Sequence, residues 1–536
     1  MRLQYYGPAV IALALAVSAC GNDSSTGSAN GEPDASETET TERLQLGILS
    51  DEGNLTPFTY ETGSPGLNLT MLTYDTLMQL DADGVPQPWL ADEIQLGDDG
   101  TSYSVDLHQD VTWHDGESLT AQDVAFSIEY YQDAPPGRFQ TALNGVDDVE
   151  VLSDYSLEIT LEDVDPSFEF RVLADVPILA EHVWSSVSDP DTVAFSEETN
   201  VGSGPYRLIE SQPGNTYRLE ANPDYFRGAP NVDEIQIVRF ADDAGATAAI
   251  RANEIDALAS TISPEQVDSM EAGGLTVLQS PEYSTTLLAF DTEKHPFDQT
   301  DVRNAIDLGI DVDRLVTDVY LDAAEAGNSG WVHPEAPWFN PDVSTEYDPA
   351  QAGDLLESSS YDGTDLELLV YGHDPLRLRL AELVAENLRD IGMNITVAAA
   401  EMQSVDDAVW PGYDVNQGRN YDMAIWGWSA TNQIDMGQMA SLIHSDTSIG
   451  NNNITGFEDE RMDDLADAMT SEMDEEERLS IAHSLQNEFA ELTPFKPLLY
   501  PNGAYAYDAG LYDGWVNIVG QGPMHKLSFI PQDGQP

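Results

Sequence analysis

The chain has 536 residues and carries 97 acidic side chains against 20 basic ones, a formal net charge of −77 at pH 7. Nucleic acid is not expected as a partner, because binding it relies on basic side chains that neutralise phosphates. Charge repulsion of this size is screened over about 8 Å at physiological ionic strength and about 3 Å at 1 M salt, so we expect a protein from a saline setting. An ordinary acidic exported protein is the alternative interpretation.

Residues 1–19 have the anatomy of a secretory signal peptide. Arg2 precedes an apolar run from Ala9 to Val17, which is shorter than the about 20 residues that a membrane-spanning helix needs. Small residues stand directly before Cys20, which resembles a bacterial lipobox, in which the cysteine is lipidated and becomes the mature N-terminus. An ordinary signal peptide with a chance cysteine is the alternative. Because Cys20 is the only cysteine, we expect an exported domain without disulfides.

A tether is expected between this cysteine and the folded part of the chain. Residues 21–41 contain no aromatic or large aliphatic side chain and are rich in Ser, Thr, Gly and acidic residues. Such a segment cannot bury enough apolar surface to offset its chain entropy. We therefore interpret residues 20–43 as a lipidated cysteine followed by a disordered acidic tether.

A strand, a hairpin and a capped helix are predicted between residues 103 and 131. Apolar and polar residues alternate over residues 103–107, which is the period of a half-buried strand, and the alternation resumes over residues 111–113 as a hairpin partner. A tight turn at residues 114–116 ends the hairpin. A helix then begins, with Thr120 as its N-cap and Asp123 in a variant of the capping box.

The same stretch resembles the signature of the family 5 extracytoplasmic solute-binding proteins, the peptide, nickel-chelate and oligosaccharide receptors of ABC importers. The family pattern runs roughly as Leu-Arg-x-x-Val-x-Phe-His-Asp-Gly-x-Pro-x-Thr-Ala-x-Asp-Val-x-Phe-Ser. The chain follows it from Leu107 to Ser127, with Trp113 for the usual Phe and Ser118 for the usual Pro. In structural terms this string is a hairpin that packs on a helix. We interpret it as scaffold, so the ligand site is expected elsewhere in the chain.

Other strings that resemble the family recur in the family's order over nearly the whole mature chain. They are Tyr74-Asp75-Thr76-Leu77, Pro88-Trp89-Leu90-Ala91, Glu181-His182-Val183-Trp184, Val201-Gly202-Ser203-Gly204-Pro205-Tyr206, Asn222-Pro223-Asp224-Tyr225-Phe226-Arg227-Gly228, Asn253-Glu254-Ile255-Asp256 and residues 297–315. The resemblance implies an α/β fold of the two-lobe, periplasmic-binding-protein-like kind, type II, with an extra subdomain in the first lobe.

The resemblance also implies the domain boundaries. Lobe 1 would comprise residues 44–281, with the inserted subdomain at about 74–200, and lobe 2 would comprise residues 282–493. Residues 494–536 would return to lobe 1. The two lobes would close over a ligand about a hinge, and the membrane permease would recognise the closed form.

Two loops are predicted to carry the ligand site. A strand–helix–strand unit between residues 366 and 399 places the loop Tyr371–Pro375 at the C-terminal end of its first strand, where open α/β sheets present ligand sites. A second loop, Trp428–Asp435, follows a strand at 423–427. The candidate ligand-binding residues are Trp428, Thr431, Asp435, Tyr371, His373 and Tyr283.

The resemblance bears on the kind of ligand. In the dipeptide-binding members, an aspartate three residues after the tryptophan holds the peptide's α-ammonium, and Thr431 stands at that position here. The same members place an arginine for the peptide's carboxylate in the loop that corresponds to Tyr371–Pro375, which contains none. A carboxylate buried without a cation is costly, so dipeptide binding by that scheme is not expected. Asp435 can instead pair with the peptide's α-ammonium from a different position in the loop, so longer peptides remain candidate ligands.

Other interpretations of these residues stay open. Trp428, Tyr371 and Tyr283 can offer flat apolar surfaces to a sugar ring or another neutral solute, or can serve packing only. Asp435 can be a helix cap, and His373 can belong to a solvated turn.

An enzyme is not expected. The nine histidines are scattered without an HExxH motif, no cysteine remains for a soft metal site, and no Gly-x-Ser-x-Gly string is present, so no metal or cofactor is predicted. We interpret the chain as a monomeric substrate-binding lipoprotein on the outer face of the cytoplasmic membrane, in the periplasm or at the cell surface. It would pass peptides, or an organic solute of similar size, to ABC permease subunits. The alternatives are an oligosaccharide receptor of the same family and an exported lipoprotein hydrolase.

Overall fold

The structure is a computed structural model that describes residues 40–49, 55–58, 66–133, 142–190, 193, 200–344 and 346–531. The predicted signal peptide, Cys20 and the tether up to residue 39 lie outside these residues. Within the described ranges, no helix combines the length and the apolar character that a membrane crossing needs.

The largest sheet of the described residues contains both parallel and antiparallel strands, in the order β16-β15-β17-β13-β18-β11-β1-β10-β9-β8, with β12 and β14 also paired to β18. Its strands are β1 (Leu44–Ile48), β8 (Tyr206–Gln212), β9 (Thr216–Ala221), β10 (Glu234–Arg239), β11 (Ala257–Leu258), β12 (Thr276–Pro281), β13 (Thr285–Phe290), β14 (Ala324–Ala326), β15 (Asp365–Tyr371), β16 (Asn394–Ala400), β17 (Met423–Trp428) and β18 (Lys496–Tyr507).

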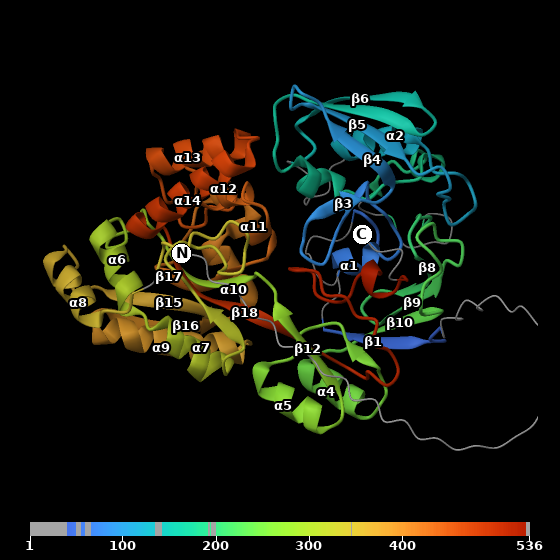
Figure 1. The fold of residues 1–536 in the computed structure, drawn as a ribbon. Helices are drawn as coiled ribbons and strands as arrows, with labels where there is room; N and C mark the ends of the chain where they lie inside the picture. Colours follow the sequence, from blue (N-terminus) through green and yellow to red (C-terminus); the bar gives the residue numbers. More distant parts are fainter. Residues whose placement is uncertain are drawn as a thin grey trace, which may run out of the picture. The chain divides into compact units, whose positions relative to one another are not determined.

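Strand β18 belongs to two parts of this sheet. Its first residues pair with β13 and β14, and its last six residues, from Asn502 to Tyr507, pair with β12. The strand therefore extends from the part of the sheet that holds β17 to the part that holds β12 (Figure 1). The chain passes between the same two parts a second time through residues 282–284, which join β12 to β13. The predicted lobe boundaries stay predictions.

The part of the sheet that contains β15, β16 and β17 is covered by helices on both faces (Figure 1). One face packs on α6 (Thr300–Gly309), α7 (Val312–Tyr320), α8 (Pro349–Ser358) and α9 (Pro375–Asp390). The other face packs on α10 (Met402–Val409), α12 (Gln438–Ile443), α13 (Glu460–Ser471) and α14 (Glu475–Leu492), with α11 (Thr431–Ile434) beside α12. The predicted strand–helix–strand unit is confirmed, because β15 and β16 pair in parallel and α9 connects them.

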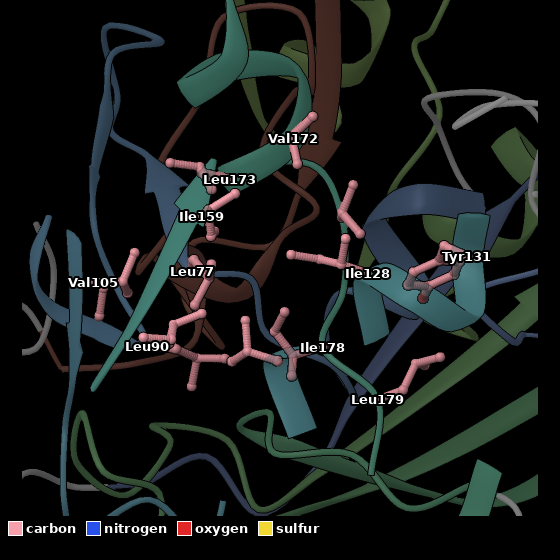
Figure 2. Close-up of a cluster of buried hydrophobic side chains, with 14 of the residues drawn as sticks. Leu77, Leu90, Val105, Ile128, Tyr131, Ile159, Val172, Leu173, Ile178 and Leu179 are labelled. Carbon is pink, nitrogen blue, oxygen red and sulfur yellow. The ribbon is translucent and has the colours of Figure 1, made fainter. Parts of the chain in front are cut away.

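The segment predicted as an inserted subdomain has its own antiparallel sheet, in the order β4-β5-β7-β6. These strands are β4 (Ala91–Leu96), β5 (Ser102–Leu107), β6 (Val146–Ser153) and β7 (Ser156–Leu161). Figure 2 shows its core, in which Val105 of β5, Ile159 of β7 and Ile128 of α2 (Ala121–Asp133) lie among buried aliphatic side chains. Smaller elements precede and follow this sheet: β2 (Met78–Leu80), β3 (Pro86–Pro88), η3 (Glu169–Leu173) and α3 (Glu181–Trp184).

One local prediction is wrong and another is confirmed. Residues 111–113 do not pair with β5, whose partners are β4 and β7; they form only an isolated bridge, between Thr112 and Ser118. Local alternation cannot show that a partner strand lies about fifty residues further along the chain. The capping box is confirmed in one direction: Asp123 Oδ2 accepts hydrogen bonds from the backbone N–H and the hydroxyl of Thr120, at 2.8 and 3.1 Å, while the Asp123 N–H donates to the Thr120 carbonyl.

Several of the recurring strings meet at one fully buried carboxylate, Asp75. It accepts hydrogen bonds from Trp89 Nε1 at 2.9 Å, Ser203 Oγ at 3.0 Å and the Tyr225 hydroxyl at 3.0 Å. Lys526, also buried, lies 2.5 Å away and neutralises its charge. These strings are therefore scaffold, as the sequence predicts for the hairpin string.

The remaining helices flank the part of the sheet that contains β1. They are α4 (Asp243–Arg251) and α5 (Pro264–Ala272), whose apolar faces pack together against residues of β11 and β18. A one-turn helix, α1 (Asn68–Thr70), precedes the string that carries Asp75.

Candidate functional site

The two predicted loops lie at the same edge of the sheet. β15 pairs in parallel with β17, so both strands end in the same direction, with Tyr371 and Trp428 as their last residues. The ring of Tyr371 lies 6.2 Å from that of Trp426 and 5.7 Å from that of His373. The fold thus brings Tyr371 and His373 of the first loop together with Trp426 of β17.

Tyr371 is fixed by a second element. Its hydroxyl donates a hydrogen bond of 2.7 Å to Asp406 of α10. Burial of the phenol and this acidic neighbour both raise the pKa of Tyr371, so the group stays a neutral donor at physiological pH. His373 is exposed at the edge of the same cluster.

Arg377 lies beside the predicted site residues, although the sequence did not single it out. It lies in the first turn of α9, which begins at Pro375 behind the capping residue Asp374. Its guanidinium carbon lies 5.1 Å from the centre of the Tyr371 ring, and its Nε lies 3.4 Å from Asp374 Oδ2. A Cβ atom at Gly427 would lie 3.2 Å from its Nη2, so the cation also touches β17. Arg377 follows the predicted loop, in the first turn of the helix.

Trp428 is half-buried and belongs to a row of aromatic rings. Its ring lies 6.3 Å from Trp426 and 5.5 Å from Trp410, which follows α10. Trp426 is buried, at 6% exposure, as expected for a side chain on the strand itself. Thr431 begins α11, directly after this row.

Asp435 takes part in a polar contact with the inserted subdomain. Its Oδ1 accepts a hydrogen bond of 2.7 Å from Ser167 Oγ and one of 3.0 Å from the Gly437 N–H. Arg478 of α14 lies 3.5 Å from the same oxygen and donates to Ser167 Oγ at 3.0 Å. All three side chains lie mostly out of solvent. Asp435 is thus paired within the chain, and its predicted role as an ammonium partner stays a prediction.

Tyr283 lies in the segment that joins β12 to β13 and has a positive φ of 55°. Its ring stacks on His333 at 4.3 Å, and its hydroxyl donates to the Glu335 carbonyl at 2.8 Å. His333 Nδ1 accepts the Glu335 N–H, and burial lowers the pKa of His333 to about 4, so the imidazole is neutral at pH 7. Gln433 of α11 joins this group to the second loop, because its Oε1 accepts a hydrogen bond of 2.8 Å from the backbone N–H of His333.

The site therefore offers a guanidinium, several half-buried aromatic faces and neutral hydrogen-bonding groups at the ends of two parallel strands. In the part of the chain that the structure describes, no three His, Cys, Asp or Glu side chains are placed to hold a metal ion. Such a combination of groups is typical of a site that binds an organic solute.

The comparisons with known proteins agree with that class. Residues 85–450 match the family described as bacterial extracellular solute-binding proteins, family 5, and the chain belongs to this family. It is similar to the di/tripeptide-binding protein 3 of Pseudomonas aeruginosa, at 24% identity over 90% of this chain and 92% of that protein. It is equally similar to the oligopeptide-binding protein AppA of Bacillus subtilis, at 24% identity over 94% of each chain.

Solved structures show the same fold. The substrate-binding protein CtaP of Listeria monocytogenes superposes with a TM-score of 0.81 at 23% identity, over 92% of this chain and 99% of that one. AppA of B. subtilis in complex with a nonapeptide superposes with a TM-score of 0.75 at 22% identity, over 92% and 100% of the two chains. The predicted fold class, a two-lobe periplasmic-binding-protein fold, is confirmed.

Proposed function

We propose that this protein is the peptide-binding component of an ABC importer, with Arg377 as the partner of the ligand's carboxylate. The similar proteins include binding proteins for dipeptides, tripeptides and oligopeptides, and they match over nearly the whole chain. The proposed role is binding and delivery without covalent chemistry. Closure of the two lobes over the peptide would present the form that the permease recognises.

Arg377 is the observation that carries the proposal. A guanidinium has five N–H donors, and its planar fork matches a carboxylate. Asp374 is its acidic neighbour, at a distance of 3.4 Å that is long for a charge-assisted hydrogen bond. The side chain is 27% exposed, so it is partly desolvated and still within reach of a ligand. The chain has only 20 basic residues, and this one lies where the sheet presents its ligand site.

The proposal includes the way the receptor is held at the cell surface. Residues 1–19 would direct export and be removed, Cys20 would carry the lipid, and residues 21–43 would tether a monomeric receptor to the outer face of the cytoplasmic membrane. Cys20→Ser removes the predicted lipidation site and tests this part. The variant should leave the membrane fraction and appear in the soluble fraction. Retention of the variant in the membrane fraction would contradict it.

The test of the proposed function compares peptides with a free and an amidated C-terminus. Amidation removes the carboxylate and keeps the length and side chains of the ligand. We expect the wild-type protein to bind the free acid roughly tenfold or more tightly than the amide, because hydrogen bonds to charged groups contribute about 1.5–3 kcal/mol. Arg377→Gln should remove this difference by weakening only the free acid.

Arg379 provides the matched control. It lies on the same helix, two residues further on, and is exposed to solvent. Arg379→Gln changes the net charge of the protein by the same amount and should leave the preference for the free acid unchanged. If Arg377→Gln keeps the wild-type preference, Arg377 does not hold the carboxylate; if no peptide binds, the peptide assignment itself is wrong.

A further inference from the structure

The side chain of Glu282 joins the two places where the chain passes between the parts of the large sheet. Glu282 is the first residue of the link 282–284 between β12 and β13, and β18 makes the other passage. Its Oε1 accepts a hydrogen bond of 2.5 Å from the hydroxyl of Tyr505, which lies in the part of β18 that pairs with β12. A Cβ atom at Gly503 of β18 would overlap the same oxygen, so the carboxyl group lies directly on the backbone of this strand.

The next residue of the link is held by the other part of the sheet. Tyr283 stacks on His333 and donates to the Glu335 carbonyl, in the segment that follows β14. Tyr283 and this segment share a hydrophobic core with β17. Two successive side chains are thus anchored in different parts of the sheet, and a rotation of such parts is absorbed by a few linking residues. A rotation therefore changes how closely Glu282 lies against Tyr505 and β18.

One turn connects the link to the second loop of the candidate site. Residues 518–522 form this turn, with a bridge between its two end residues. A Cβ atom at Gly520 would lie 3.7 Å from the Glu282 carbonyl and 2.9 Å from Ile434 Cδ1, and it would overlap Ala430. Only a residue without a side chain fits between these groups. A movement of the second loop on ligand binding therefore acts on the turn that contacts Glu282.

Burial makes the charged form of Glu282 unfavourable in this position. It raises the pKa of the carboxyl group above the ordinary value of 4.5, and the hydrogen bond from Tyr505 lowers it by a smaller amount. Burial and the nearby carboxylate keep the pKa of Tyr505 well above its usual value of 10, so this hydroxyl is a neutral donor at physiological pH. The neutral acid is therefore favoured as long as the carboxyl group is enclosed.

The other ionisable groups around the link face Tyr283. Burial first, and then the charges of Glu335 and Asp83, raise the pKa of Tyr283, so this phenol stays neutral. Burial lowers the pKa of His333 to about 4, so its imidazole is neutral above pH 5. Neither Tyr283 nor His333 thus carries a positive charge that would stabilise the carboxylate of Glu282.

We propose that closure of the two predicted lobes over the peptide takes up one proton from solvent on Glu282, so that the receptor binds its ligand more tightly in mild acid. This inference rests on the proposed function and adds its regulation by pH. Opening admits water to the carboxyl group and restores its ordinary acidity, whereas closure encloses it on β18. Between the ordinary pKa of 4.5 and the raised pKa of the closed form, closure requires a proton, so the affinity falls as the pH rises and is constant above this range.

The test uses alanine peptides of two to five residues, which have no ionisable side chain, and measures their affinity by calorimetry between pH 5 and pH 7. Two buffers with different enthalpies of ionisation give the number of protons taken up on binding. We expect the affinity of the wild type to fall as the pH rises, by at most about tenfold per pH unit because a single proton is exchanged. Glu282→Gln keeps an acceptor for the Tyr505 hydroxyl. It should take up no proton and bind at pH 7 as tightly as the wild type does at pH 5.

Glu325→Gln is the matched control, because it removes an exposed carboxyl group from β14, which also pairs with β18, and it should keep the wild-type pH dependence. Tyr505→Phe removes the donor that stabilises the carboxylate, so the fall in affinity should move to higher pH. A wild type without proton uptake, a Glu282→Gln variant with the wild-type pH dependence, or a Tyr505→Phe variant with an unshifted profile would overturn the inference while peptide binding stands. A wild type that binds none of the peptides at any pH would overturn the proposed function as well.

Discussion

Lys526 Nζ lies 2.5 Å from Asp75 Oδ1, and both side chains are buried although 451 residues separate them in the chain. The contact joins the C-terminal segment to the string that follows α1. The three neutral donors on Asp75, from Trp89, Ser203 and Tyr225, come from three further strings that resemble the family. Four of the strings that resemble the family, together with the C-terminal segment, therefore meet in one buried polar network that belongs to the scaffold.

Removing the cation from this network should be strongly destabilising. Lys526→Met leaves the Asp75 charge buried without a counter-ion, which costs about 3–5 kcal/mol in free energy of unfolding. Arg314→Met is the control, because Arg314 pairs with Asp318 and Glu386 at the exposed surface, where solvent screens the pairs and their loss should change stability little. Urea denaturation monitored by tryptophan fluorescence measures both variants. Equal losses in the two would show that the buried pair has no special role.

His333 should make the protein less stable in mild acid. Burial lowers its pKa in the folded state to about 4, below the ordinary value of 6.5, so the unfolded chain takes up the proton first as the pH falls. The stabilisation that this neutral imidazole provides is present above about pH 6.5 and is lost toward pH 4, by about 1.4 kcal/mol per pH unit. His333→Asn removes this proton uptake. The difference in unfolding free energy between wild type and variant should therefore decrease from pH 7 to pH 4, and a difference that does not change with pH would contradict the prediction.

The contact of Asp435 with Arg478 and Ser167 predicts a cost for leaving a carboxylate unpaired. Arg478→Met should destabilise the protein by about 3 kcal/mol, because Asp435 is 6% exposed and would lose its cation. The double variant Arg478→Met with Asp435→Asn should recover part of this loss, since no buried charge remains. Thermal melts of the two variants side by side give the comparison. A double variant less stable than Arg478→Met alone would mean that hydrogen bonds to Asp435 matter more than its charge.

The acidic composition predicts a response to salt. With a net charge of −77, repulsion between carboxylates should weaken the fold at low ionic strength and be screened at molar salt. The melting midpoint should rise between low salt and 1 M potassium chloride. A midpoint that stays constant or falls would leave the saline setting without support.

The sequence predicted the regular elements well where one helix or strand carries its own signal. The strand–helix–strand unit of β15, α9 and β16 was predicted because the periodicity of each element is local and no distant residue overrides it. Strand pairing failed at residues 111–113 because the partners of β5 lie elsewhere in the chain.

The candidate site was predictable only in outline. The edge of the sheet followed from the strand–helix–strand pattern, and so did the involvement of Tyr371 and Trp428 as neighbours of that edge. Arg377 was missed because the loop was taken to end at Pro375, although the first turn of the helix faces the same place. The partners of Asp435 could not be foreseen, because Ser167 is 268 residues distant in the chain.

The measurement that tests the central claim most directly is a thermal-shift screen of the purified protein in high salt, against di- to pentapeptides, oligosaccharides and nickel chelates. A ligand at about 100 times its Kd stabilises the folded state by roughly 2.7 kcal/mol, which is large enough to see. We expect peptides with a free carboxylate to raise the melting midpoint and the other two classes to leave it unchanged. A shift with oligosaccharides or nickel chelates and none with any peptide would contradict the account.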